Sequence, residues 1–140
     1  MQWENAAHAG FTTRDAKPWM TVNIDYSQWN VASQVDDPQS VLAYWKAMLA
    51  LRKQHSDLFV YGTYTPWSEE MTGSEYVLGY EMVSSETERK SVVLLNFSAD
   101  AHKVALDQQQ CLSMLVSNQK QGLDEGAVTL QPYGACVLVS

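Results

Sequence analysis

The sequence predicts an all-β antiparallel sandwich preceded by an irregular arm and a single α-helix. Two observations lead to this prediction. One apolar stripe has helical spacing, and it is followed by short segments rich in Val, Tyr, Leu and Thr that turn residues separate. The chain has 140 residues, of which 46% are hydrophobic and 18% charged, as in globular proteins. We expect an arm over residues 1–37, a helix within residues 38–55 and a β-domain over residues 56–140.

The arm is rich in aromatic side chains that follow neither a period of 2 nor a period of 3.6. Gly10 and Pro18 interrupt any regular element in it. Aperiodic stretches of this length are too long for an ordinary connection. The arm is therefore either functional or separated from the body that orders it. Its large rings are Trp3, Phe11, Trp19, Tyr26 and Trp29.

The helix is the clearest single element. Asp37 is a favourable N-cap, and Pro38 suits the first helical position. Arg52 and Lys53 fall in the last turn, where positive charge suits the helix dipole. The wide apolar stripe indicates that the helix packs on something substantial. The stripe consists of Val41, Leu42, Trp45, Met48 and Leu49, with Tyr44 and Leu51 beside it.

The remaining sequence alternates strand-like segments with turns, which is typical of an antiparallel sandwich. Turn residues separate the segments, and Pro132-Tyr133-Gly134 lies inside the last one. The predicted strands are Leu58–Trp67, Tyr76–Val83, Ser91–Phe97, Lys103–Leu106, Cys111–Val116 and Ala127–Val139, and the longest predicted turn is Ser117–Gly126.

Residue types suited to catalysis form no recognisable motif. Glu4 and Asp25, in the arm, are the acids we retain as candidates for a free-standing hydrolase, although a structural role is favoured for both. The three histidines, His8, His55 and His102, are isolated. We therefore predict no metal, no cofactor and no nucleophile with a positioned base.

Charge and hydropathy exclude other classes. The net charge of −7 disfavours nucleic-acid binding, and no apolar run reaches membrane-spanning length. The first ten residues lack the features of a signal sequence, so we expect a cytoplasmic protein. A disulfide between Cys111 and Cys136 cannot be argued from spacing. If the protein is secreted, Asn96 is a glycosylation acceptor, although it lies in a strand-like run.

The arm's aromatic rings have two possible uses. Trp and Tyr present flat apolar faces that suit stacking on sugar rings. The same rings also suit packing between the β-domain and a neighbouring body, which is favoured for Trp19 and Trp29. Composition and spacing leave this choice open.

A series of short motifs resembles the α-glucosidases of the α-amylase superfamily, and most closely the maltase, isomaltase and oligo-1,6-glucosidase group. The match is dense to residue 64 and thinner beyond it. The opening Met1-Gln2-Trp3 resembles the end of an R-T-P-M-Q-W motif. The other matching residues are Ala9-Gly10-Phe11, Lys17-Pro18-Trp19-Met20, Val22-Asn23, Asn30-Val31, Gln34, Asp37-Pro38, Ser40, Tyr44-Trp45-Lys46, Leu51-Arg52-Lys53, Tyr61-Gly62 and Leu95-Asn96-Phe97-Ser98.

The resemblance implies a place for each part in such an enzyme. Residues 1–37 would be the loop after the last strand of a (β/α)8 barrel, residues 38–55 its last helix, and residues 56–140 the sandwich called domain C. The family's catalytic Asp, Glu and Asp would lie in barrel segments preceding Met1, so the resemblance assigns no catalytic residue here. It places Gln2 and Trp3, with Glu4 beside them, at the rim of the substrate pocket.

Two interpretations of function follow. In the first, the chain is the C-terminal portion of an α-glucosidase that hydrolyses terminal bonds of maltose- or isomaltose-type sugars. It would then be inactive alone, and it would meet an α-glucoside only together with the catalytic barrel as its partner. In the second, the chain is a non-enzymatic β-sandwich module that binds α-glucosides or caps a partner. Either way, we expect no nucleic-acid or membrane partner.

Overall fold

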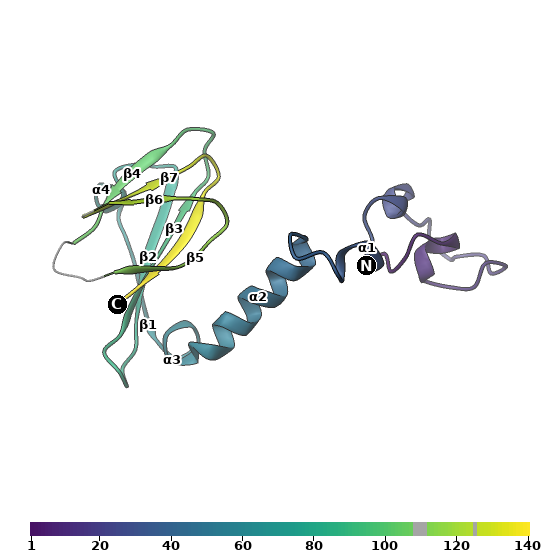
Figure 1. Cartoon of the computed structure of the whole chain (residues 1–140), viewed down its shortest axis with the longest axis horizontal. Coiled ribbons are helices and arrows are strands. Elements are labelled where there is room, and N and C mark those ends of the chain that lie inside the picture. The colour runs from purple at the N-terminus through teal and green to yellow at the C-terminus, as the bar shows by residue number, and fades with distance from the viewer. Residues whose placement is uncertain (108–111, 125) are drawn as a thin grey trace. The chain divides into compact units, whose positions relative to one another are not determined.

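The computed structural model describes residues 1–107, 112–124 and 126–140 (Figure 1). It divides into two compact units, Met1–Gln54 and His55–Ser140. The first contains the arm and the helix, and the second contains the strands. The sequence predicted this fold class, and the structure confirms it: an antiparallel β-sandwich follows an irregular arm and one long α-helix.

The arm of the first unit contains only short helical turns between irregular segments. This agrees with its aperiodic sequence, because no apolar stripe favours one face of an element. Asn30 caps the last of these turns: its Oδ1 accepts from the Ser33 backbone N at 2.8 Å, and its Nδ2 donates to the Tyr26 carbonyl at 2.9 Å. The elements of the arm are η1 (Ala7–Gly10), η2 (Ile24–Ser27) and α1 (Val31–Gln34).

The long helix α2 (Val41–Gln54) begins later than predicted. Ser40 is the N-cap, since its Oγ accepts from the Ala43 backbone N at 3.1 Å. The Asp37 carboxylate instead accepts from the Gln39 backbone N at 2.8 Å, within a turn that contains Pro38. The predicted N-cap at Asp37 was therefore wrong. Asp37 has the right chemistry for a cap, but it caps a turn rather than the helix.

The apolar stripe of α2 is exposed. Trp45 is 61% exposed, Val41 67% and Leu49 59%, and no residue of the helix is buried. Tryptophan and leucine at one face of a helix normally face a core. The described residues of the first unit do not cover this face.

The second unit consists of two antiparallel sheets, with α3 (Ser56–Phe59) and α4 (Glu69–Thr72) beside the strands (Figure 1). A five-stranded sheet has the order β1-β2-β3-β8-β5, and a three-stranded sheet has the order β4-β7-β6. The strands are β1 (Thr63–Pro66), β2 (Val77–Val83), β3 (Lys90–Asn96), β4 (His102–Ala105), β5 (Ser113–Ser117), β6 (Gly122–Asp124), β7 (Ala127–Leu130) and β8 (Ala135–Val139).

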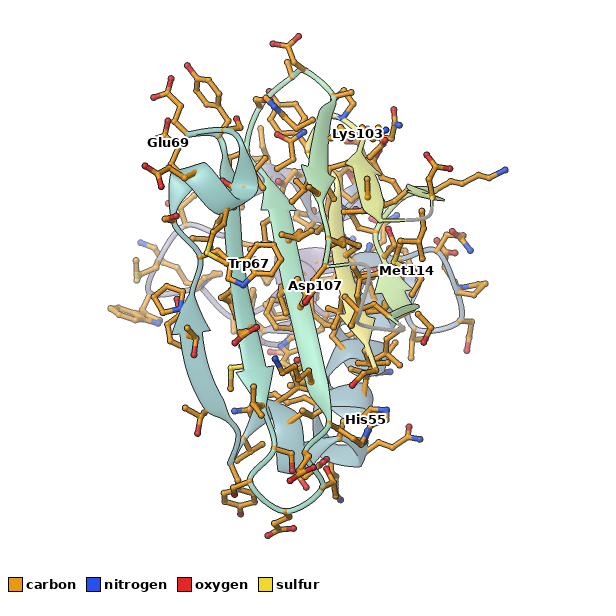
Figure 2. All side chains as sticks on the ribbon, turned by 90° about the vertical axis from the view of Figure 1, so that its left-hand side faces the viewer. His55, Trp67, Glu69, Lys103, Asp107 and Met114 are labelled. Carbon is orange, nitrogen blue, oxygen red and sulfur yellow. The ribbon has the colours of Figure 1, made fainter. Side chains whose placement is uncertain are left out.

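The core lies between the sheets. Strand β3 contributes Val92 and Leu94, and the three-stranded sheet contributes Val104, Val128 and Leu130, all at most 1% exposed. Trp67 packs against this cluster, and Figure 2 shows it in the middle of the sheet, with Glu69 and His55 toward opposite ends. Alternate strand residues thus form one continuous apolar layer.

Three details of the predicted strands were wrong. Leu58 lies in α3, so the segment predicted as one strand from Leu58 to Trp67 is a helical turn followed by β1. Strand β6 lies inside the predicted turn Ser117–Gly126. The segment Ala127–Val139 forms two strands, β7 and β8, on either side of the turn predicted at residues 132–134. Local composition did not separate these short elements, because pairing with a neighbouring strand decides which of them form.

The Asn96 side chain joins the end of β3 to two turns. Its Nδ2 donates to the carbonyls of Asp100 at 2.7 Å and Gln131 at 2.9 Å. Its Oδ1 accepts from the backbone N and the Oγ of Ser98, both at 2.9 Å. Asn96 is 4% exposed. The nitrogen that a glycan would require is thus buried and hydrogen-bonded within the fold.

A polar cluster lies near the start of the second unit. The Asp57 carboxylate accepts from Thr87 Oγ1 at 3.1 Å and lies 3.7 Å from Arg89. Desolvation alone would raise the pKa of Asp57, but the Thr87 hydrogen bond and the Arg89 charge outweigh it, so this pKa is lowered. Both Arg89 terminal nitrogens lie 3.4 Å from His55 Nδ1. The cluster therefore connects α3 to the β2–β3 turn.

Cys136 is 2% exposed, and its thiol is free. Burial raises the pKa of this thiol to about 11. Cys111, the other cysteine of the disulfide considered from the sequence, lies outside the described residues. Across the part of the chain that the structure describes, no helix is both long and apolar enough to cross a bilayer.

Candidate functional site

Backbone hydrogen bonds hold Gln2 and Trp3 between η1 and α1. Trp3 N donates to the Ala9 carbonyl at 2.9 Å. Val31 N donates to the Gln2 carbonyl and Ala32 N to the Trp3 carbonyl, both at 2.9 Å. The segment predicted to contain site residues is therefore fixed on both sides by backbone contacts, in an otherwise irregular arm.

The Gln2 side chain binds Asp25. Its Nε2 donates to Asp25 Oδ1 at 2.6 Å and to the Asn23 carbonyl at 3.3 Å. The structure thus brings a predicted rim residue together with one of the two acids retained as candidates. Sequence reasoning missed this pair, because 23 residues separate its members and no local pattern connects them.

Trp3 and Glu4 lie above a tight left-handed turn. His8, Ala9 and Gly10 have φ values of 59°, 53° and 75°, a run of three residues in the left-handed region. A Cβ placed on Gly10 would lie 2.9 Å from Glu4 Cγ and 3.1 Å from Trp3 Cβ. Glycine is thus needed here both for its backbone angle and for the close approach.

An open hollow of about 830 Å³ lies beside Gln2. Gln2 is the one predicted rim residue that lines it, whereas Trp3 and Glu4 are not among its lining residues. Trp3 is 52% exposed and Trp19 is 94% exposed, so both rings are available for contact. The lining is largely apolar and includes Phe11, Pro18, Trp19, Met20 and Val22.

This arrangement suits binding more than chemistry. The Asp25 carboxylate is an acceptor for Gln2, and Glu4 lies beside Gly10. Among the described residues, no group of three or more His, Cys, Asp or Glu side chains is arranged to hold a metal ion. What the arm offers is exposed aromatic and apolar surface beside one ordered amide–carboxylate pair.

Comparison with known proteins identifies the class. The family model described as the catalytic domain of alpha amylase matches residues 1–62. The isomaltulose synthase of Erwinia rhapontici NX5, solved in complex with sucrose, has the same fold over 99% of this chain and 24% of that chain, with a TM-score of 0.79 and 22% identity. The chain belongs to the α-amylase superfamily.

Sequence relatives narrow the assignment to one group. The alpha-glucosidase of Schizosaccharomyces pombe is 37% identical over 142 residues, covering 99% of this chain and 23% of that protein. The oligo-1,6-glucosidase of Bacillus cereus is 34% identical over 143 residues, covering 98% of this chain and 24% of that protein. The chain corresponds to the C-terminal part of an α-glucosidase. It spans about a quarter of the length of these relatives.

Proposed function

We propose that this chain is the C-terminal portion of an α-glucosidase that hydrolyses terminal bonds of maltose- or isomaltose-type sugars. The observation that carries the proposal is the match over 99% of the chain, at 37% identity, to an enzyme named alpha-glucosidase. In this proposal the sandwich and α2 have structural roles. The segment Gln2–Glu4 lies at the rim of the substrate pocket, where the Gln2–Asp25 hydrogen bond supports its position.

We further propose that the chain has no hydrolytic activity by itself. Retaining cleavage of a glycosidic bond needs two carboxyl groups about 5–5.5 Å apart on either side of that bond. In the resemblance, the residues that do this work lie in barrel segments preceding Met1.

In this proposal the chain binds an α-glucoside only together with the catalytic barrel, which is its partner. We also place this function in the cytoplasm, where a reducing environment suits the free thiol of Cys136. Expression in the source cells, followed by fractionation and detection of the chain, tests this location. Recovery with the secreted fraction would contradict it.

A chimera tests the main proposal. Residues 1–140 replace the matching quarter of the S. pombe enzyme, and hydrolysis of maltose, isomaltose and sucrose is measured for the chimera and for the purified chain. We expect turnover by the chimera and none by the chain. A stably folded chimera without turnover would overturn the proposed parent function, and turnover by the chain alone would overturn its inactivity.

Exposed aromatic rings around the hollow favour a second candidate, a non-enzymatic module that binds α-glucosides. Titration of the purified chain with maltose, monitored by tryptophan fluorescence, distinguishes this module from the enzyme portion proposed above. Saturable binding that is lost in Trp19→Ala but retained in Trp67→Phe would favour the module. Trp67 is a suitable control, because it packs against the core of the second unit rather than lining the hollow.

A further inference from the structure

The side-chain amide of Gln2 uses both of its N–H bonds inside the arm. Its Nε2 donates to Asp25 Oδ1 at 2.6 Å and to the Asn23 carbonyl at 3.3 Å. A primary amide nitrogen carries two hydrogens, so these two bonds account for the donors of this side chain. The hydrogen-bonding group that Gln2 has left for another molecule is its carbonyl oxygen, Oε1, which can only accept.

Asp25 determines which way round the Gln2 amide lies. The oxygen and the nitrogen of a glutamine side chain are nearly equal in size, so their hydrogen-bond partners distinguish the two orientations. A reversed amide would place Oε1 against the Asp25 carboxylate, so that two acceptors would face each other without a proton between them. The bond to Asp25 is also shorter than the bond to the Asn23 carbonyl, and bonds to a carboxylate are the stronger kind.

The backbone holds both members of this pair in place. The Gln2 carbonyl accepts from Val31 N at 2.9 Å, which fixes the start of the chain against α1. The Asp25 carbonyl accepts from Gln28 N at 2.9 Å and from Trp29 N at 3.0 Å, at the beginning of η2. Gln2 and Asp25 are both half-buried. The orientation of the amide is therefore a fixed property of the folded arm.

We propose that Asp25 is a positioning residue that makes Gln2 an acceptor at the substrate rim and so selects a sugar hydroxyl over a substituent that cannot donate. The inference rests on the proposed function, in which Gln2 lies at that rim. A hydroxyl group donates through its hydrogen, whereas a fluorine or an ether oxygen in its place does not. Such an analogue leaves the acceptor unpaired, which is the basis of discrimination between polar substrates.

Lys17 has the opposite role in the same surface. It lines the hollow together with Gln2, and it is exposed. An ammonium group only donates, so Lys17 favours acceptor atoms of a ligand. A neutral sugar satisfies both side chains, because each of its hydroxyl groups donates one hydrogen bond and accepts others.

NMR of the purified chain tests the orientation of the amide without relying on activity. We expect nuclear Overhauser contacts between the Gln2 Nε2 protons and the β protons at position 25. They should persist in Asp25→Asn, which keeps an acceptor oxygen, and be lost in Asp25→Ala, where the amide is free to turn. Absence of these contacts in the unsubstituted chain, or their persistence in Asp25→Ala, would overturn the proposal.

Hydrolysis by the chimera tests the selectivity. The values of kcat/KM are compared for maltose and for its monodeoxyfluoro analogues, one for each hydroxyl, because fluorine replaces the hydroxyl without donating. We expect Asp25→Ala to reduce the penalty of one analogue by about fivefold, the worth of one neutral hydrogen bond. The penalties of the other analogues should stay unchanged, and Asp25→Asn should retain most of the selectivity.

Asp15→Ala is the matched control, since Asp15 is an exposed acid of the same arm that is not among the residues lining the hollow. Equal effects of Asp15→Ala and Asp25→Ala would overturn the proposal. So would penalties that change at every hydroxyl or at none, because a general loss of arm structure acts on all positions alike. A folded chimera without turnover would overturn only the proposed function, and the same penalties measured as maltose dissociation constants would then decide the role of Asp25.

Discussion

Asn96 provides the sharpest prediction for the stability of the sandwich. Its amide makes four hydrogen bonds to three residues of the adjoining turns, at 2.7–2.9 Å, and it is 4% exposed. Asn96→Ala removes all four. Because the Asn96 side chain is buried, its hydrogen-bond partners in the two turns lose these bonds in a site that water reaches poorly.

The magnitude follows from the partners. Each neutral hydrogen bond contributes about 1 kcal/mol net. Asp100 is exposed, so water can replace the bond that its carbonyl loses. Gln131 and Ser98 are half-buried, so water replaces their lost bonds less completely. We therefore expect a loss of about 3 kcal/mol in the free energy of unfolding. For a unit of this size, that loss lowers Tm by roughly 12–24 °C.

Urea unfolding followed by circular dichroism measures this loss, with Asn118→Ala as the control. Asn118 also makes two side-chain hydrogen bonds, from Nδ2 to the Tyr133 carbonyl at 3.0 Å and to Oδ1 from the Ala135 backbone N at 2.8 Å. It is exposed, so we expect its loss to stay below about 1 kcal/mol. Equal losses of unfolding free energy in the two variants would refute the argument that burial makes the hydrogen bonds of Asn96 contribute more to stability than those of Asn118.

Three further predictions concern the turn under Trp3, the stability of the fold at acidic pH and the buried thiol of Cys136. Gly10→Ala should destabilise the arm by about 1–3 kcal/mol, seen as faster proteolysis of residues 1–35; unchanged proteolysis would contradict the close approach to Glu4. Because the pKa of Asp57 is lowered in the fold, its ionised carboxylate stabilises the folded chain above about pH 5, and this stabilisation is lost as the pH falls below about 4. Asp57→Asn should therefore flatten the decline in unfolding free energy over that range. An unchanged slope would count against this role of Asp57. Cys136, with a pKa of about 11, should resist alkylation at neutral pH in the native chain and react in urea, as peptide mapping would show; rapid native alkylation would be incompatible with its burial.

The sequence alone determined the class of fold and the family. Strand-like segments with turn residues predicted the sandwich, because alternation and turn chemistry are local properties. The motifs from Met1 to Gly62 indicated the α-glucosidases, and the family model covers the same residues. The amphipathic stripe predicted α2, although its beginning was set by Ser40 and not by Asp37.

Only the tertiary structure decided which distant residues meet. The Gln2–Asp25 hydrogen bond joins residues 23 positions apart, and Asn96 reaches Gln131 across 35 positions. Strand register decided that Tyr64, Leu78 and Tyr80 share one uncovered face. Such contacts depend on how the chain folds back on itself, and a shift of one residue in register would move a whole strand's side chains to the opposite face. Local patterns contain no record of that register, so the face that these three residues share appears only in the folded sheet.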